Sequence, residues 1–189
     1  MNIFYLDTDP WTAAKSMHNK HICKMMVESC QMLANAFDAE VLEREAPKTA
    51  SGTAWKHSHF NHPSAVWVRQ SAENYLWLLE HATALYCEYT FRYEKTHSCE
   101  KFVRWASRFY SRVSFPSTEF TPPPRCMPDQ YKSADTVAAY RAYYVSEKLS
   151  YTLKGKRYCN KWPSGCIPKW VEDASSAILN RALHTLVVG

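Results

Sequence analysis

The sequence predicts an all-α protein: a compact single helical domain over residues 1–189, built on two long core helices and joined by proline-rich loops. The chain has only four glycines, a composition that disfavours a turn-rich all-β fold. Apolar residues keep a helical period through residues 9–37 and again through residues 61–95. Five of the ten prolines fall within residues 114–131, so this stretch is predicted to be irregular. At 46% apolar residues, the chain can bury a substantial core.

The first long segment, residues 9–37, is predicted to form one continuous amphipathic helix. Asp9 can cap its start, and Pro10 suits the first helical position, where a missing N–H costs nothing. With successive residues about 100° apart around the axis, one side collects the apolar residues Ala14, Met17, Ile22, Met25, Met32, Leu33 and Ala36. We expect that side to face the core.

Three polar residues fall on the same side of this helix: His18, His21 and Glu28. Lys20 and Lys24 line the adjoining flank. Burying a carboxylate without a partner is costly, so Glu28 is either hydrogen-bonded within the core or lines a pocket. The residues alone leave both interpretations open.

The segments around this helix have different patterns. Residues 2–6 are predicted to form a short strand or an extended arm packed on the body, and residues 38–61 a polar surface loop. Pro63 marks the start of the second long helix. Ser71 can cap a second helical piece, which predicts a bend between the two.

Three further helices are predicted, over residues 99–113, 133–153 and 168–187, and Ser133 is the expected cap of the middle one. Arginines recur every fourth residue along residues 99–113: Arg104, Arg108 and Arg112. Such a stripe is either a solvated surface or a track for phosphates.

Residues 154–170, which we call the basic–aromatic segment, mix two kinds of side chain. Its basic residues are Lys154, Lys156, Arg157, Lys161 and Lys169, and its aromatic residues include Tyr158, Trp162 and Trp170. Basic residues interleaved with aromatic ones can grip a phosphate backbone while stacking unpaired bases. The alternative is a packed aromatic connection with solvated lysines.

Composition limits the classes of protein to which this chain can belong. The formal charge of +5 and a pI of about 8.8 are mildly basic and compatible with nucleic acid. We expect no membrane span and no signal peptide, because no apolar run is long enough and the N-terminus lacks a basic region. The seven scattered cysteines then favour reduced thiols in the cytoplasm.

Common catalytic motifs are absent from the sequence: there is no Walker loop, GxGxxG, GxSxG or HExxH. Cys159 and Cys166 are too far apart for a zinc knuckle. The histidines of the first long segment and the cluster His57, His59 and His62 could together make a metal site. Nothing in the sequence orients them, and we expect neither a metal nor another cofactor.

Two blocks of the sequence resemble the pyrimidine-dimer DNA glycosylase superfamily, which includes the endonuclease V of a T-even phage. The first block is HNKHICKMMVESCQML, residues 18–33, in which Glu28 falls where the family has its catalytic glutamate. The second is residues 61–95, with a His-Pro entry and a long helix that ends in Arg92-Tyr93. The chain also resembles small tailed-phage proteins that begin MNIFYLD.

The resemblance implies a DNA glycosylase, with AP-lyase activity as a further step, that acts on damaged or modified bases in duplex DNA. Glu28 would be the catalytic carboxylate, and the attacking amine would be Met1 Nα or Lys24, with His21 beside them. The family's amine belongs to a threonine exposed by loss of the initiator methionine, whereas Asn2 favours retention of Met1. Val27 replaces the arginine that precedes the glutamate in the phage enzyme.

The expected partner is double-stranded DNA, in a host cytoplasm if the chain is phage-encoded. The expected DNA contacts are Lys20, His62, Arg69, Lys156, Arg157, Lys161 and Trp162. Two other functions stay open: a non-enzymatic phage protein that binds DNA or a host factor, and a metal-dependent nuclease built on the histidines.

Overall fold

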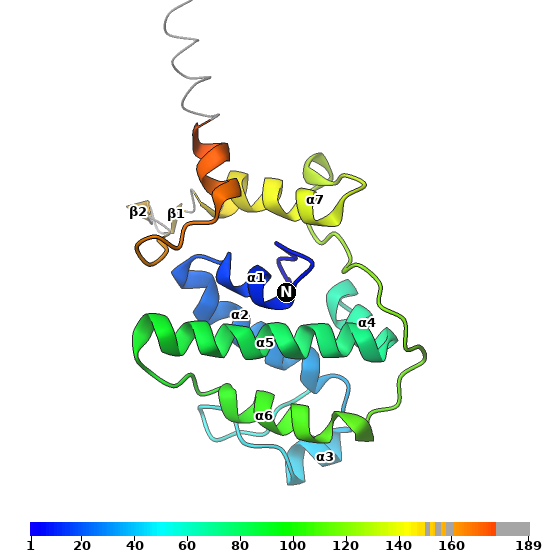
Figure 1. The fold of residues 1–189 in the computed structure, drawn as a ribbon. Coiled ribbons are helices and arrows are strands. Elements are labelled where there is room, and N and C mark those ends of the chain that lie inside the picture. Colours follow the sequence, from blue (N-terminus) through cyan, green and yellow to red (C-terminus); the bar gives the residue numbers. More distant parts are fainter. Residues whose placement is uncertain (150–151, 154–155, 158–160, 177–189) are drawn as a thin grey trace, which may run out of the picture.

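The computed structural model describes residues 1–149, 152–153, 156–157 and 161–176 (Figure 1). The predicted all-α class is confirmed, and the described residues add only one short strand pair, β1 (Thr152–Leu153) antiparallel to β2 (Lys156–Arg157). The α-helices are α1 (Pro10–Lys15), α2 (Asn19–Ala34), α3 (Ala39–Arg44), α4 (Pro63–Gln70), α5 (Ala72–Tyr93), α6 (Glu100–Phe109) and α7 (Thr136–Tyr143). A π-helical turn, Tyr144–Lys148, continues α7, and residues 169–176 are also helical.

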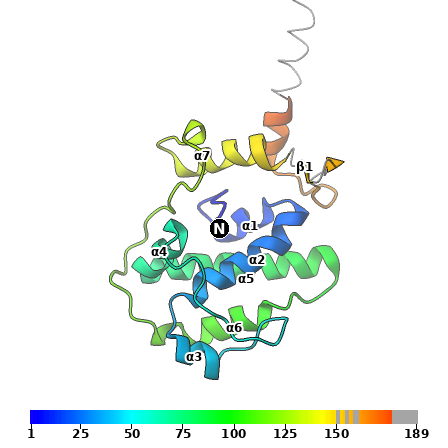
Figure 2. The same ribbon diagram turned by 180° about the vertical axis from the view of Figure 1, so that it is seen from behind.

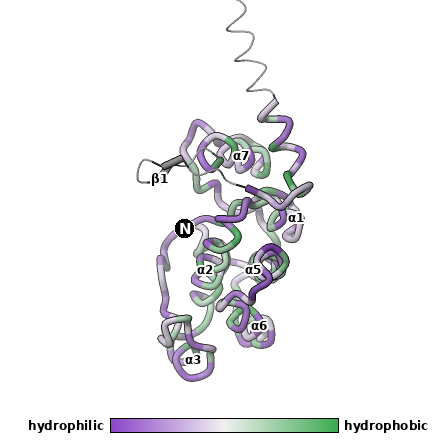
Figure 3. The backbone as a smooth tube through the Cα atoms, turned by 90° about the vertical axis from the view of Figure 1, so that its left-hand side faces the viewer, coloured by the Kyte–Doolittle hydropathy of each residue, from purple (hydrophilic) through white to green (hydrophobic). Residues whose placement is uncertain are grey.

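Helix α5 crosses the middle of the molecule, with α2 beside it (Figures 1 and 3). Helices α6 and α3 lie at one end, and α7 lies at the other. The core is continuous from the N-terminal arm to Tyr144 and includes fully buried Met25 of α2 and Tyr75 and Leu85 of α5.

The prediction of one helix over residues 9–37 is wrong, because the chain breaks between α1 and α2. The start is as expected: the Asp9 carboxylate accepts the Thr12 N–H at 2.7 Å, and Pro10 occupies the first position. His18 then adopts an extended backbone conformation with ψ of 159°, and its ring Nδ1 caps α2 by accepting the His21 N–H at 3.4 Å.

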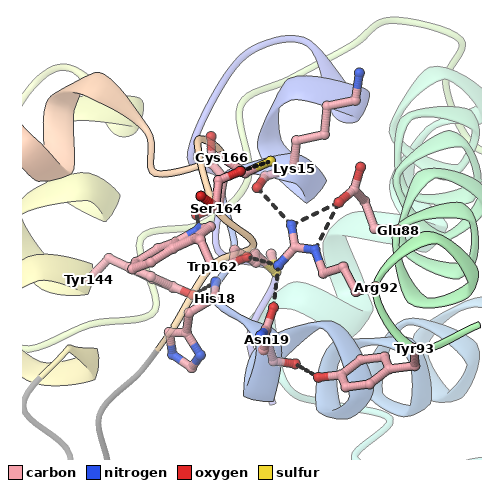
Figure 4. A network of polar contacts seen from close by, with 12 residues as sticks. Lys15, His18, Asn19, Glu88, Arg92, Tyr93, Tyr144, Trp162, Ser164 and Cys166 are labelled. Atoms are coloured by element: carbon pink, nitrogen blue, oxygen red, sulfur yellow. Dashed lines mark hydrogen bonds and ion pairs between the residues drawn. The ribbon is translucent and has the colours of Figure 1, made fainter.

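Arg92 of α5 holds this break in place (Figure 4). Its guanidinium donates to the carbonyl oxygens of Lys15 at 3.0 Å and Met17 at 2.7 Å, and to Asn19 Oδ1 at 3.1 Å. Glu88 lies 2.8 Å away and balances the charge of an arginine side chain that is only 2% exposed. The break is therefore fixed by a residue far along the chain.

Two other expectations also need correction. Residues 38–61 are not entirely loop, because they include α3, which is anchored by the fully buried Leu42. The predicted helix over residues 133–153 begins only at Thr136, where the Asp135 carboxylate accepts the Ala138 N–H at 3.1 Å, so Ser133 is not the cap. Its predicted end is also wrong, because the helical residues stop at Lys148 and residues 152–153 form β1.

Other expectations are confirmed. Helix α4 begins at Pro63, and the Ser71 hydroxyl caps α5 after a bend. Residues 114–131 are irregular apart from the short 3₁₀ turn Asp129–Tyr131 and an isolated β-bridge from Ser117 to Ser71. The last predicted helix is present over residues 169–176, and its remainder lies outside the described residues.

The N-terminal residues form an extended arm and not a strand. Residues 3–6 are buried, and Phe4 takes a positive φ of 54°, which few non-glycine residues adopt. Tyr5 packs on Trp77, whose indole N–H donates to the Thr8 carbonyl at 2.8 Å. The N-terminus itself lies on the α7 side of α2 (Figure 2).

Buried histidine makes the fold sensitive to acid. His81 is fully buried and stacked on Trp77, and within the described part of the chain neither of its ring nitrogens has a hydrogen-bond partner. Burial lowers its pKa from 6.5 to about 3. As the pH falls from 6.5 towards 3, the His81 ring binds a proton in the unfolded chain but stays neutral in the folded protein. The free energy of unfolding therefore falls.

We predict that His81→Leu weakens this acid sensitivity. Between pH 7.5 and pH 4.5, the midpoint temperature of thermal unfolding should fall less for this variant than it does for the unsubstituted protein. The control is His59→Asn at an exposed position with φ of 48°, where asparagine fits the backbone and the pH dependence should not change. An unchanged pH dependence in His81→Leu would contradict the assignment.

Candidate active site

The four predicted catalytic residues meet at one cavity of about 520 Å³. It is lined by Met1, Asn2, Phe4, His18, Lys20, His21, Lys24, Glu28, Cys126, Tyr143 and Lys148. Helix α2 contributes Lys20, Lys24 and Glu28 at intervals of four residues, which places them in a row along one face. The N-terminal arm forms the second wall, and residues from the C-terminal half form the third.

Glu28 lines this cavity and is hydrogen-bonded there. Its side chain is 14% exposed, Oε2 accepts the Asn2 N–H at 2.8 Å, and Oε1 lies 3.2 Å from Lys24 Nζ. The side chain of Asn2 is fixed in turn, because Nδ2 donates to the Cys126 carbonyl at 2.9 Å and Oδ1 accepts the Phe4 N–H at 2.9 Å. The carboxylate is thus tied directly to the start of the chain.

The N-terminal amine and His62 lie close to Glu28. Burial lowers the pKa of His62, the positive N-terminus lowers it further, and the negative charge of Glu28 opposes both. His62 is not among the residues that line the cavity, although both charges act on its ring. The ring is oriented by its Nδ1, which accepts the Ser64 N–H at 3.2 Å at the start of α4.

The His21 ring is oriented by a hydrogen bond to Tyr144. The Tyr144 hydroxyl accepts the His18 N–H at 3.1 Å and lies 2.9 Å from His21 Nδ1. Since the hydroxyl already accepts one bond, its own proton is best placed on the bond to His21 Nδ1, which leaves the His21 proton on Nε2. Burial, helped by the positive charges nearby, lowers the pKa of His21 to about 2 and that of His18 to about 4.

Positive charge outweighs negative charge around this cavity. Among the described residues that line it, Lys20, Lys24, Lys148 and the N-terminal residue Met1 contribute positive charge, and Glu28 is the one carboxylate. An aromatic wall adjoins them: the Phe4 and Tyr143 rings lie 6.2 Å apart at 21°, and Lys148 Nζ is 4.6 Å from the Tyr143 ring centre. A cationic cavity with an aromatic wall is suited to an anion that carries a flat ring.

The expected DNA contacts are only partly brought together. Lys20 lines the cavity, but His62 does not, and Arg69 stacks on Phe60 at 3.5 Å away from the cavity lining. Lys156 and Arg157 form β2, and their side chains lie outside the described part of the structure.

Trp162 of the basic–aromatic segment packs against the protein. Its indole N–H donates to the Ser16 carbonyl at 3.1 Å, and its ring meets His18 edge-on at 6.0 Å (Figure 4). The Lys161 carbonyl accepts the Asn19 N–H at 2.8 Å, while the Lys161 residue is exposed. These contacts stabilise the break between α1 and α2. They match the alternative of a packed aromatic connection with solvated lysines.

Several cavity residues were missed by the sequence interpretation: Asn2, Phe4, Cys126, Tyr143 and Lys148. Asn2 and Phe4 could have been inferred from their closeness to Met1 in the chain. The other three carry no local signal, because only the tertiary fold brings residues of the C-terminal half to α2.

Among the described residues, no three His, Cys, Asp or Glu side chains are grouped so that they could hold a metal ion. The His57 ring is instead within 2.8 Å of the Phe37 carbonyl. None of the helices in the described part is long and apolar enough to cross a membrane.

Comparison with known proteins gives one match. A family model described as pyrimidine dimer DNA glycosylase matches residues 1–101. The match includes the arm, α2 and α5, but not the third wall of the cavity with Cys126, Tyr143 and Lys148. No curated protein and no solved structure gives a significant match.

We predict that Tyr144→Phe lowers the free energy of unfolding by about 1–3 kcal/mol, because it leaves the buried His18 N–H and His21 Nδ1 without their partner. Chemical denaturation measures this loss. The matched control is Tyr143→Phe, which removes the hydroxyl of the neighbouring residue but no interaction described above. Equal stability of the two variants would contradict the role given to the Tyr144 hydroxyl.

Proposed function

The chain belongs to the pyrimidine dimer DNA glycosylase family, and we propose that it removes damaged or modified bases from duplex DNA and then cleaves the abasic site as an AP lyase. One observation carries the proposal: the Glu28 carboxylate lies in a cationic cavity, 2.8 Å from the backbone nitrogen of Asn2 and next to the N-terminal amine. A carboxylate and an amine at one site are the two groups that this chemistry requires.

In the proposed reaction, an amine attacks C1′ of the target nucleotide while the bond to the base breaks. The base leaves with a proton and the amine loses one proton. The C1′–O4′ bond then opens as O4′ takes up a proton, which leaves an iminium ion between the protein and the sugar. Removal of a C2′ proton then allows the 3′ phosphate to leave by β-elimination. Glu28 stabilises the cationic sugar and transfers these protons.

Three nitrogens are candidates for the attacking amine. Met1 Nα belongs to the residue that precedes the Asn2–Glu28 hydrogen bond, and Lys24 Nζ lies 3.2 Å from Glu28. If Met1 is removed, the third candidate arises, because the Asn2 nitrogen already bonded to Glu28 becomes the free α-amine. Each candidate would leave a different covalently labelled peptide.

Substrate recognition rests on the other cavity residues. Lys20 and Lys148 supply positive charge for the phosphates, and His21, neutral at pH 7, offers a hydrogen bond and no charge. The rings of Phe4 and Tyr143 offer apolar faces to a base turned out of the duplex. A volume of about 520 Å³ falls within the range of about 300–1,000 Å³ typical of small-ligand sites.

We predict that borohydride traps the protein covalently on DNA that contains an abasic site, since reduction fixes the iminium ion. Peptide mapping should locate the adduct at the N-terminus, on Met1 or on an exposed Asn2. An N-terminal extension should abolish trapping, while a C-terminal one should not. An adduct on Lys24 would exclude the α-amine, and the absence of any adduct despite DNA binding would exclude the lyase step.

We also predict that Glu28→Gln folds, binds DNA and loses turnover by about 10²-fold or more, because the amide can neither stabilise the cationic sugar nor take up a proton. Base excision under single-turnover conditions measures the loss.

The matched control for this substitution is Glu100→Gln. Glu100 also forms an i,i+4 ion pair, with Arg104, and its side chain is 17% exposed, close to the 14% of Glu28. The turnover of the Glu100→Gln protein should be unchanged. A folded Glu28→Gln protein with full turnover would overturn the assignment.

A further inference from the structure

Residues 58–62, which we call the Phe60 tip, form a tight turn directly before α4. The His59 carbonyl accepts the His62 N–H at 2.9 Å, and His59 has a positive φ of 48°. Within the turn, Phe60 is 42% exposed, and Asn61 beside it is exposed as well. A large apolar side chain therefore lies in contact with water at the end of this turn.

Two hydrogen bonds from the end of α2 fix the base of the Phe60 tip. Asn35, the C-cap of α2, accepts the Ser58 N–H at 3.0 Å with Oδ1 and donates from Nδ2 to the Ser58 carbonyl at 2.9 Å. Asn35 itself is buried. The Phe60 tip is thus attached to the end of the helix that carries Glu28.

The Phe60 ring is supported by two neighbouring side chains. Arg69 Cζ lies 3.5 Å from the ring centre, a close cation–π contact, and the centre of the His57 ring lies 5.2 Å from it. The His57 ring is held in turn, with Nε2 at 2.8 Å from the Phe37 carbonyl. Because these contacts order the ring before any partner binds, inserting it into a partner costs little conformational entropy.

Short contacts connect the Phe60 tip to the active-site cavity. Ser64 follows Phe60 by four residues, and its hydroxyl lies 3.4 Å from Sγ of Cys126, which lines the cavity. Four residues span at most about 14 Å, which is about four base-pair steps of DNA. The segment between α3 and α4 and the N-terminus both lie on the side of α2 that faces away from α5 (Figures 2 and 3).

The segment around the Phe60 tip suits a polyanion. No Asp or Glu occurs from residue 46 to residue 72, whereas Lys48, Lys56 and Arg69 are basic. DNA-binding proteins that bend the duplex insert apolar side chains of this kind between base steps as wedges. An ordered aromatic ring within a basic segment therefore fits the base stack of duplex DNA.

We propose that Phe60 is a wedge that enters the base stack of duplex DNA next to the nucleotide held in the active-site cavity. The inference rests on the proposed glycosylase function and adds to it the step that opens the duplex. A nucleotide turned out of the duplex leaves its neighbours unstacked, and the inserted ring replaces part of the lost stacking. Phe60 thus acts on the opening of the duplex, and Glu28 acts on the bonds of the extruded nucleotide.

The experiment uses the full chain and two duplexes. The first contains a thymine dimer opposite two adenines, and the second has abasic analogues in place of these adenines, so that its dimer is unpaired. Phe60→Ala should slow single-turnover excision from the paired duplex at least about tenfold, and from the unpaired duplex much less, because an unpaired base costs less to extrude. Phe60→Leu should keep most of the rate on both duplexes, since leucine also serves as a wedge.

The control is Phe91→Ala, which removes another exposed phenylalanine ring, from α5. Excision by this variant should be unchanged on both duplexes, and thermal unfolding checks that every variant is folded. If Phe60→Ala is not slowed, or is slowed equally on both duplexes, Phe60 does not open the duplex.

A measurement without turnover separates the wedge from the proposed enzymatic function. When the Glu28→Gln protein binds the paired duplex, 2-aminopurine placed next to the dimer should gain fluorescence as its stacking is disrupted, and adding Phe60→Ala should remove at least about half of that gain. No gain, or a gain that does not depend on Phe60, would exclude the wedge. A Phe60-dependent gain without excision by the unsubstituted protein would exclude only the glycosylase function.

Discussion

The buried guanidinium of Arg92 fixes the geometry on which the active-site cavity depends. An arginine that is only 2% exposed needs nearly all of its donors satisfied, and Glu88 together with carbonyl oxygens of the α1–α2 break satisfies them. Those carbonyls are available only because the helix stops there. Stopping α1 and restarting α2 lets His18 cap the new helix, so the ion pair, the break and the orientation of α2 stabilise one another.

From this break, the row Lys20, Lys24 and Glu28 extends along α2 to the N-terminal arm. The arm is held by its buried apolar residues and by the two side-chain hydrogen bonds of Asn2. The Asn2 backbone N–H in turn fixes one carboxylate oxygen of Glu28, and Lys24 faces the other. The Glu28 carboxylate is thus positioned by the N-terminal arm and by its own helix, and not by a loop.

The cavity combines charged lysines with neutral histidines, and burial explains the difference. His18 and His21 are enclosed by Phe4, Tyr144 and Trp162, so their charged forms are disfavoured. Lys20 and Lys24 are exposed, in contrast to these buried rings. The family match ends at residue 101, yet Tyr144 and the third wall of the cavity come from later residues. The C-terminal half therefore sets the electrostatics of groups that lie inside the family-matched region.

Local sequence determined much of the secondary structure and part of the site. Caps and prolines act on their own neighbours, so Asp9 with Pro10, Pro63 and Ser71 could be interpreted without the fold. Helical spacing alone set Lys24 beside Glu28, four residues apart. The break near His18 could not be predicted, because the apolar period continues through it and its stabilising arginine lies 75 residues from Met17.

The third wall of the cavity was likewise decided only by tertiary structure. The Cys126 carbonyl meets the Asn2 side chain across 124 residues of sequence, and Tyr144 meets His21 across 123. The choice between a core role and a cavity role for Glu28 was decided in the same way. A helical period says which face a residue occupies, but only the packing of distant elements determines whether that face meets apolar side chains or an open cavity.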